Sequence, residues 1–288
     1  MPEAGSDGAP PKTEIKVLII DGFNNHTWQV VTARYLTILG RDPIFKPTVS
    51  TVPAQEDPKW STWKPDFGAY DVIVQNTTDI GGTKGAWPKE TQVAFEQYMS
   101  NGGRMLTHHA ANHGFASWVE YNKMIATAWR PVSYGSAISV KEDGTFTLIP
   151  PGMGTNTRHD FRGDALIHQV NNHPIYQGLP KEWMAETIEV IQYMRGPAQN
   201  VTVLSYNYDP VEKLNFPTSW LVQYGKGLTY NSNYGHTKDP VGTTGESMRC
   251  AAFETIHERA IRWLAGVTKM PPVPADFPTA TATSVRAQ

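Results

Sequence analysis

A run of apolar residues near the start of the chain constrains the fold more than any other feature. The segment IKVLIIDG, residues 15–22, is apolar almost throughout and is stopped by Asp21 and Gly22. A strand with one face in water alternates polar and apolar residues, whereas a continuous apolar run is typical of a strand covered on both faces, as in a parallel sheet between two layers of helices. The sequence therefore predicts a buried parallel strand here.

Strand and helix patterns alternate along the first half of the chain. The helical segments carry apolar residues at three- and four-residue spacing, and two of them end at glycines, as helices commonly do. Predicted strands cover residues 15–21, 43–51, 70–76 and 104–109, and predicted helices cover 27–40, 88–101 and 115–129. This alternation favours a doubly wound, open α/β sheet.

The second half of the chain is less regular. A hairpin is expected where Asp143 and Gly144 supply a turn between two alternating runs. The remaining predicted elements are that hairpin at 137–150, strands at 164–170 and 200–207, a second hairpin at 218–233 and a final helix at 245–266.

The two ends of the chain are rich in Pro, Ala, Ser and Thr, a composition typical of extended or flexible segments. We therefore predict one α/β domain over residues 15–267, with a flexible N-terminal tail at 1–14 and a flexible C-terminal tail at 268–288. The first 14 residues lack the basic start and apolar core of a signal peptide. The sequence leaves open whether the protein is cytoplasmic or exported.

Charge and motif content exclude several classes of function. The formal net charge is −2 and no polybasic run occurs, so neither nucleic acid nor a membrane is an expected partner. No G-x-G-x-x-G segment or P-loop is present, so no nucleotide cofactor is expected. Whether the protein forms a homo-oligomer stays open.

Polar residues gather in the segments that follow predicted strands. In open α/β sheets, ligands bind beyond the carboxyl ends of the strands, so these segments should converge on one site. The candidate residues in them are Asp21, His26, Asn76, His108, His109, His113 and His236.

Three of these histidines lie close together in the segment THHAANHG. If the strand continues through His108 and His109, their rings point to opposite sides, so one is structural and the other faces the cleft. Imidazole titrates near neutral pH and can act as general acid, general base or metal ligand. Neither H-E-x-x-H nor H-x-x-E-H spacing occurs, so no residue is assigned to a metal site, although a divalent metal ion stays open as a cofactor.

A second polar segment begins at Arg158. This arginine and Arg162 could hold a carboxylate or sugar hydroxyls, and the same segment carries His159 as a candidate site residue. His173, in the segment NNHPIYQGLP, is either a substrate ligand or the cap of a turn that its prolines fix.

The order of these motifs resembles the ThuA-like, or trehalose-utilisation, family. The similarity spans about residues 16–265, through the segments VLIIDGFNNHTW, YDVIVQNTT, GGRMLTHHAAN, HDFRG, NNHPIYQGLPKEW and YGKGLTYNSNYGH. The resemblance implies a class I glutamine amidotransferase-like fold, that is, a flavodoxin-like, mostly parallel sheet with helices on both faces. It also implies a role in carbohydrate catabolism, often of oxidised or keto sugars.

The resemblance further implies a site without a reactive thiol. Amidotransferases of that fold place a cysteine after the strand that corresponds to RMLTH, whereas this chain has histidine and alanine there. Cys250, the single cysteine, lies at the start of the last predicted helix and cannot substitute. A thioester route, and with it a glutaminase activity, is therefore excluded.

Matching the family's motifs carries its polar site positions to His26, His108, His173 and His236. Glu186 matches the acid of a motif of the form DE-x-Y, but the segment AETIE lacks the preceding Asp and the following Tyr. Glu189 lies three residues further on, so on a strand at most one of the two acids points into a site.

Two function hypotheses follow. The first is an enzyme that hydrolyses, eliminates from or isomerises a glycoside or keto-sugar, with His108 or His109 as the acid–base group and Asp21 or Glu186 as the orienting acid. The alternative is a non-catalytic sugar-binding module whose tryptophans stack on sugar faces. The residues expected to bind the carbohydrate are His26, Asn76, His113, Arg158, His159, His173 and His236.

Overall fold

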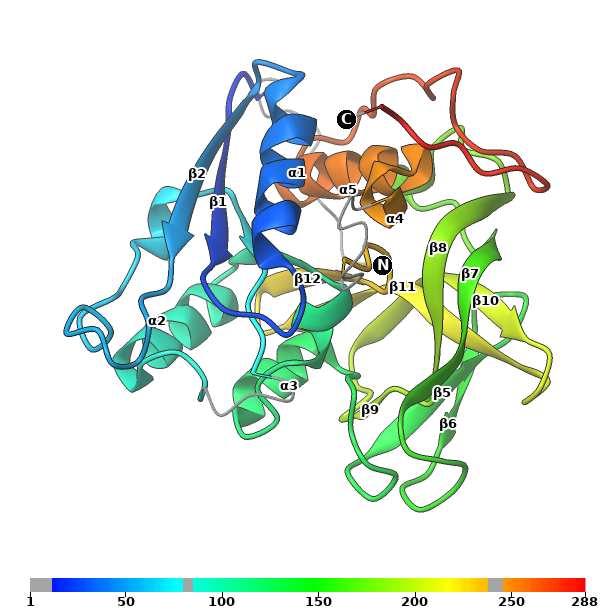
Figure 1. Ribbon diagram of the computed structural model, residues 1–288, viewed down its shortest axis with the longest axis horizontal. Helices are drawn as coiled ribbons and strands as arrows, with labels where there is room; N and C mark the ends of the chain where they lie inside the picture. Colours follow the sequence, from blue (N-terminus) through cyan, green and yellow to red (C-terminus); the bar gives the residue numbers. More distant parts are fainter. Residues whose placement is uncertain (1–11, 80–84, 238–245, 288) are drawn as a thin grey trace.

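A nine-stranded sheet runs through the described part of the computed structural model, which covers residues 12–79, 85–237 and 246–287 (Figure 1). The strand order is β2-β1-β3-β4-β12-β11-β10-β7-β8. The first five strands in this order are parallel to one another: β2 (Phe45–Thr51), β1 (Ile15–Asp21), β3 (Val72–Gln75), β4 (Arg104–His108) and β12 (Gly227–Ser232). This is the 2-1-3-4-5 order of flavodoxin-like sheets, so the predicted doubly wound fold is confirmed.

The other four strands extend the sheet in antiparallel fashion. They are β11 (Leu214–Tyr224), β10 (Val201–Asp209), β7 (Arg158–Gln169) and β8 (Glu182–Gln192). The sheet thus has a parallel half and an antiparallel half, where the sequence predicted a mostly parallel sheet. The difference has a physical reason: most of β11 is buried although it is antiparallel, so its apolar run does not reveal its direction.

A smaller sheet of three strands lies beside the large one. The hairpin predicted at 137–150 forms β5 (Ser136–Val140) and β6 (Phe146–Ile149), and β5 also pairs with the short β9 (Arg195–Gly196).

Helices cover both faces of the parallel half (Figure 1). On one face, α1 (Trp28–Gly40) and α5 (Ala251–Leu264) share a core with Val17 and Ile19. On the other, α2 (Lys89–Ser100) and α3 (Val119–Ile125) share a core with Leu18 and Ile20. Alternate residues of β1 therefore meet different helix layers, which is why the strand is apolar throughout.

The final helix is interrupted, contrary to the sequence prediction. It consists of α4 (Glu246–Arg249) and α5, separated by Cys250, whose backbone is extended (φ −53°, ψ 127°). At this interruption Cys250 forms an isolated antiparallel β-bridge with Val285 of the C-terminal segment. None of the described helices has both the length and the apolar character needed to cross a membrane.

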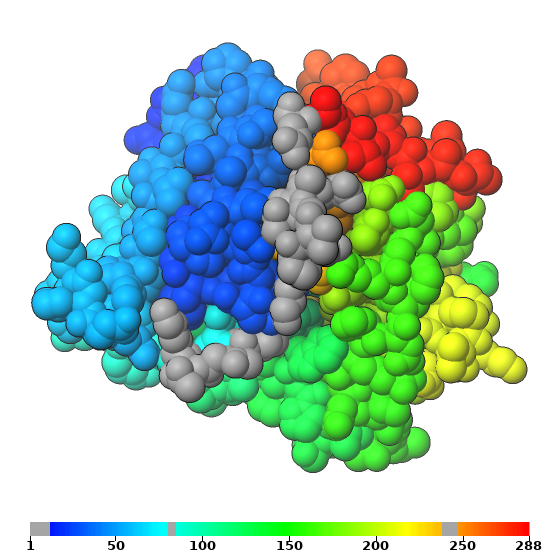
Figure 2. Space-filling model, in the orientation of Figure 1, coloured from blue at the N-terminus to red at the C-terminus, as the bar shows by residue number. Residues whose placement is uncertain are grey.

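The C-terminal segment, residues 268–287, is extended as predicted, but it is held against the domain. The backbone N–H of Met184 donates to the Thr279 carbonyl, and the N–H of Ala251 donates to the Ser284 carbonyl. Figure 2 shows this segment, in red, in contact with the orange and green parts of the molecule. The structure therefore corrects the prediction of a free tail here. Most of the tail predicted at the N-terminus lies outside the described residues.

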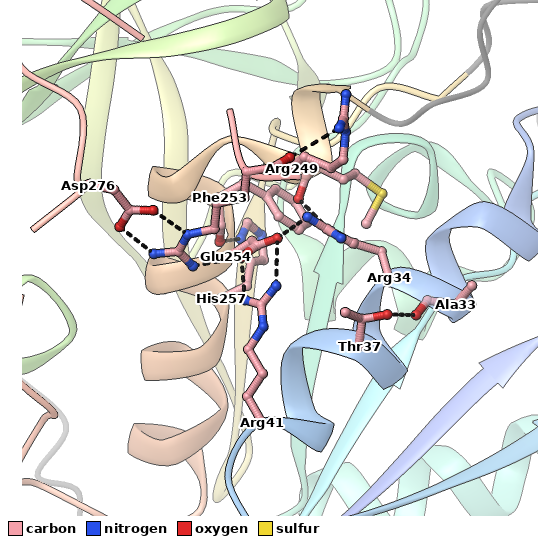
Figure 3. Close-up of polar contacts among 11 residues, drawn as sticks. Ala33, Arg34, Thr37, Arg41, Arg249, Phe253, Glu254, His257 and Asp276 are labelled. Atoms are coloured by element: carbon pink, nitrogen blue, oxygen red, sulfur yellow. Dashed lines mark hydrogen bonds and ion pairs between the residues drawn. The ribbon is translucent and has the colours of Figure 1, made fainter. Parts of the chain in front are cut away.

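A buried carboxylate ties the C-terminal segment to the helices (Figure 3). Glu254, in α5, is 1% exposed and forms ion pairs with Arg34 and Arg41 of α1. Arg286 approaches the same carboxylate at 2.6 Å and also pairs with Asp276 at 2.7 Å. One acidic group thus joins two helices and the last residues of the segment.

Candidate functional site

The chain turns sharply where β4 ends. His108 has an extended backbone (φ −145°), whereas His109 opens the short 3-10 helix η2 (His109–His113) with φ 44°. A bulky residue in the left-handed region is strained, and such strain gathers at functional sites. His109 lines a cavity and His108 does not, and the two rings diverge because the strand ends between them, whereas the alternation argument assumed that it continued.

His108 is the structural member of the pair. Its Nδ1 lies 3.1 Å from the Tyr35 hydroxyl, and its ring packs against Phe253 and His257. Burial lowers the pKa of His108 well below its usual value, so the ring is neutral. The side chain does not line the cavity described below, so its position does not support the acid–base role predicted for His108.

A cavity of about 520 Å³ opens beyond the carboxyl end of β4. Five of the chain's nine histidines line it. The lining residues are Asn25, His26, His109, Ala110, His113, Trp129, His159, Arg162, Glu189 and His236. The convergence predicted for the polar segments thus occurs, with His26, His109, His113, His159 and His236 together at one place.

Three imidazole rings form the floor of this cavity, and we call them the imidazole triad: His26, His109 and His236. Their centroids are 4.7 Å apart for His26 and His109, and 5.0 Å apart for each of these with His236. The Nε2 atoms of His26 and His109 lie 3.1 Å apart. The three ring planes are nearly perpendicular to one another, with interplanar angles of 84°, 87° and 78°.

Polar neighbours hold the triad in place. His26 Nδ1 lies 3.0 Å from Asn25 Oδ1, and His109 Nδ1 lies 3.3 Å from the Asn233 carbonyl. Both acceptors require a proton on Nδ1, so they select the tautomer whose Nε2 carries a lone pair. Burial, reinforced by the charge of His26, lowers the pKa of His109 well below its usual value.

Glu189, on β8, is the acid of the cavity. Its Oε1 lies 3.0 Å from His236 Nε2 and 3.4 Å from His159 Nε2, and its Oε2 lies 3.8 Å from His109 Nε2. Burial alone would raise the pKa of Glu189, but the hydrogen bond from His236 and the neighbouring imidazoles outweigh burial and lower it. The group is therefore a carboxylate at neutral pH.

His113 and Trp129 form a second wall. The backbone N–H of Trp129 donates to His113 Nδ1 at 3.0 Å, which places the ring proton of His113 on Nε2. That Nε2 is buried and has no hydrogen-bond partner among the described residues. A buried donor without a partner costs free energy that a ligand can recover.

His159 and Arg162 come from β7 and face Glu189 across the ladder. Arg162 pairs directly with Glu189 in the register of β7 and β8. The His159 side chain is 35% exposed, against 4% for His109, so it is more open to solvent than the triad. His159 is thus positioned to exchange protons with water or a ligand.

Two predicted residues of the first loops have structural roles instead. The Asp21 carboxylate accepts hydrogen bonds from Thr32 Oγ1 at 2.6 Å and Thr51 Oγ1 at 2.7 Å, and it is 2% exposed. Asn76 donates to the Trp28 carbonyl at 3.1 Å. Neither side chain lines the cavity, and their hydrogen bonds instead hold the loops and strands next to it.

Arg158 and Glu186 also lie away from the cavity. Arg158 forms ion pairs with Asp160 and Glu212, while Arg162, further along the same strand, lines the cavity. Glu186 accepts a hydrogen bond from Thr187 Oγ1 at 3.0 Å. Thr187 has φ 43° and lies at a register shift between β7 and β8, and Glu189, two residues further on, lines the cavity whereas Glu186 does not.

His173 caps a turn, which was the second of its two predicted roles. It precedes the 3-10 helix η3 (Pro174–Tyr176), and its Nδ1 accepts the Ile175 N–H at 3.3 Å. Its ring packs against Trp263, with centroids 4.4 Å apart. The substrate-binding role predicted for His173 is therefore not supported by its position.

Replacing His173 by Asn should flatten the acid dependence of stability. Burial lowers the pKa of His173 from 6.5 to about 4, so between these values the unfolded chain binds a proton that the folded protein refuses. The contribution is complete above pH 6.5 and is lost as the pH falls toward 4, with a slope of up to about 1.4 kcal/mol per pH unit. Asn keeps an acceptor for the cap but does not titrate. Urea unfolding of both proteins at pH 7 and pH 5 measures the difference, and equal losses would contradict this assignment.

Five further residues line the cavity: Asn25, Ala110, Trp129, Arg162 and Glu189. Arg162 was named with Arg158 as a candidate ligand, and Trp129 is one of the tryptophans expected to stack on a sugar in the binding-module alternative. Asn25 adjoins a predicted histidine, and Glu189 was one of two alternatives, so a signal existed for both. Trp129 lies beyond α3, and the shortness of that helix was not evident from its sequence.

Comparison with known proteins agrees with this architecture. The model of the ThuA family, described as trehalose utilisation, matches residues 16–264. No protein with a curated description matches the chain.

Two solved structures of proteins described as ThuA-like share this fold. A protein described as ThuA-like from Parabacteroides merdae superposes with a TM-score of 0.83 at 29% identity, covering 95% of this chain and 98% of that chain. A second, from Bacteroides uniformis, has a TM-score of 0.55 at 19% identity and covers 90% of this chain and 95% of its own. A glutamine amidotransferase from Thermotoga maritima has a TM-score of 0.47 at 10% identity, covering 88% and 98% respectively.

Proposed function

This chain belongs to the ThuA family, and from that membership we propose that it is a carbohydrate-catabolic enzyme that acts on a glycoside or keto-sugar in the imidazole-rich cavity. The reaction is hydrolysis, elimination or isomerisation, driven by histidine acid–base chemistry. The observation that carries the proposal is the contact between His159 and Glu189, a partly exposed imidazole held by a carboxylate inside a cavity.

The cavity offers the contacts that a sugar requires. Sugars present hydroxyl groups around a ring with apolar faces, so their sites combine hydrogen-bonding groups with an aromatic surface. Trp129 supplies an aromatic side chain, while Arg162 and the Nε2–H of His113 supply donors. These groups support binding of an uncharged or carbonyl-bearing sugar.

His159 is the best acid–base group on geometric grounds. A general base must reach the substrate and exchange its proton with solvent. Glu189 Oε1, 3.4 Å from His159 Nε2, orients that ring. His108 is buried and contacts Tyr35, and the Nε2 of His109 contacts His26. Both rings are therefore less suited to transfer a proton to a substrate than His159.

Replacing His159 by Ala should lower turnover by about 10²–10⁴-fold, the usual contribution of one positioned acid–base group. Sugar binding should change much less, because Trp129, Arg162 and His113 remain. The substrate is found first by screening oxidised and unoxidised glycosides against wild-type protein and identifying products by mass. His168→Ala is the matched control, since His168 lies on the same strand but pairs with Glu182 outside this cavity. Unchanged turnover in His159→Ala would contradict the assignment.

The alternative is a sugar-binding module without catalysis. The observation that favours it is the Trp129 ring in the cavity wall, on which a sugar face can stack. In that case Trp129→Ala should weaken sugar binding, no product should form in the screen, and His159→Ala should have no effect on binding. Calorimetric titration of wild-type protein and the two variants with each screened sugar separates the two functions.

A further inference from the structure

We propose that the imidazole triad binds one divalent first-row transition-metal ion. The inference goes beyond the proposed function and does not depend on it. Three histidines from distant parts of the chain, His26 in the loop after β1, His109 in η2 and His236 after β12, bring one ligand nitrogen each to within 4.8 Å of the others. Imidazole nitrogens are the preferred protein ligands of Zn²⁺, Cu²⁺, Ni²⁺ and Fe²⁺.

The spacing of the rings fits a single ion. With metal–nitrogen bonds of about 2.0–2.1 Å, two ligand nitrogens lie about 2.9 Å apart at a right angle and about 3.4 Å apart at the tetrahedral angle. The Nε2 atoms of His26 and His109 are 3.1 Å apart, between these limits.

Ring positions give a second, independent check. An imidazole centroid lies about 1.2 Å behind its ligand nitrogen, so the centroids of two rings on one ion should be about 4.5–5.3 Å apart. The three observed separations are 4.7, 5.0 and 5.0 Å. All three pairs therefore satisfy the same geometry.

The partners of the rings match those of metal-bound histidines. Such histidines donate their second ring N–H to a carboxylate, a backbone carbonyl or another acceptor, which fixes the tautomer. In this structure the acceptors are Asn25 for His26, the Asn233 carbonyl for His109 and Glu189 for His236. The Nε2 lone pairs selected at His26 and His109 face each other, an arrangement that a cation between them stabilises.

Charge and access also suit an ion. The three ligands are imidazoles, which carry no negative charge, and the Glu189 carboxylate beside them supplies it. His109 and His236 are 3% and 5% exposed, while His26 is partly exposed at the cavity wall. The ion would therefore sit at the floor of the cavity with one side toward its open space, the arrangement of metal sites that polarise a bound ligand.

The test uses full-length protein without a histidine tag, stripped with a chelator and then dialysed. Titration with Zn²⁺ should show one tight equivalent by calorimetry, and titration with Co²⁺ should give visible d–d absorption of a low-symmetry site. His26→Ala and His109→Ala should each weaken Zn²⁺ binding by more than the roughly 10–100-fold that loss of an outer partner costs. His168→Ala, an accessible histidine elsewhere, is the control and should bind as wild type does.

The outcomes separate this inference from the proposed function. No stoichiometric Zn²⁺ or Co²⁺ binding by wild-type protein, or equal binding by wild type and both triad variants, would overturn the metal site. Circular dichroism checks that the variants fold, and His26→Ala, in a partly exposed loop, guards against misfolding at the strained His109. His159→Ala should retain metal affinity while losing turnover, so failure of the sugar reaction leaves the metal result intact.

Discussion

Glu189→Gln should lower turnover of the sugar substrate by about 10²–10⁴-fold, although the change preserves the size of the side chain. The amide cannot supply the negative charge that orients His159 at 3.4 Å and accepts from His236 at 3.0 Å. Both contacts involve the same oxygen, so a single substitution disturbs both histidines. Initial rates on the sugar identified in the product screen measure the effect.

The matched control for this prediction is Glu186→Gln, on the same strand. Glu186 contacts Thr187 rather than the cavity, so its amide should leave turnover essentially unchanged. Comparing the two variants therefore shows whether the cavity acid, Glu189, or the acid matched by the family motif, Glu186, takes part in the reaction. If Glu186→Gln abolished turnover and Glu189→Gln did not, the motif would be the better guide and the cavity would be the wrong site.

Glu254→Gln should destabilise the protein by about 3–5 kcal/mol, the usual effect of removing one member of a buried ion pair. Glu254 is 1% exposed, and the Arg34 side chain that pairs with it is only 9% exposed. Without the carboxylate, that guanidinium stays buried with no counter-charge from Glu254. Desolvation by burial already lowers the pKa of Arg34 against the opposing attraction of Glu254. Urea unfolding at pH 7 measures the loss.

Glu258→Gln provides the comparison, one turn further along α5. Glu258 pairs with Arg262 at 2.8 Å, but its side chain is 25% exposed, so the expected loss is at most about 1 kcal/mol. Equal losses in the two variants would show that burial does not set the strength of the Glu254 contacts. A loss confined to Glu254→Gln would show that it does.

Periodicity and motif order predicted the parallel half of the sheet well. In β1 the apolar run is continuous because Val17 and Leu18 meet helices on opposite faces, and this demand is visible in the sequence. The direction of the later strands was not predictable from pattern, because a buried antiparallel strand such as β11 is as apolar as a parallel one. Residue order alone could not distinguish the two.

Five of the histidines singled out from the sequence line the cavity, whereas His108 and His173 lie outside it. The loops after β1, β4 and β12 converge because parallel strands end at one edge, so His26, His109 and His236 follow from the topology. Register shifts interrupt the β7–β8 pairing near these residues, so simple alternation does not show which of Glu186 and Glu189, or of Arg158 and Arg162, lines the cavity. Such bulges depend on pairing between strands, which local sequence does not encode.

The two halves of the sheet divide the cavity between them. The parallel half and its loops hold the three triad rings, whereas the β7–β8 ribbon carries His159, Arg162 and Glu189. The ribbon is joined to the rest of the sheet by β10. Substitutions at His159 or Arg162 should therefore change which molecules the cavity accepts while the loops that carry the three imidazoles keep their positions.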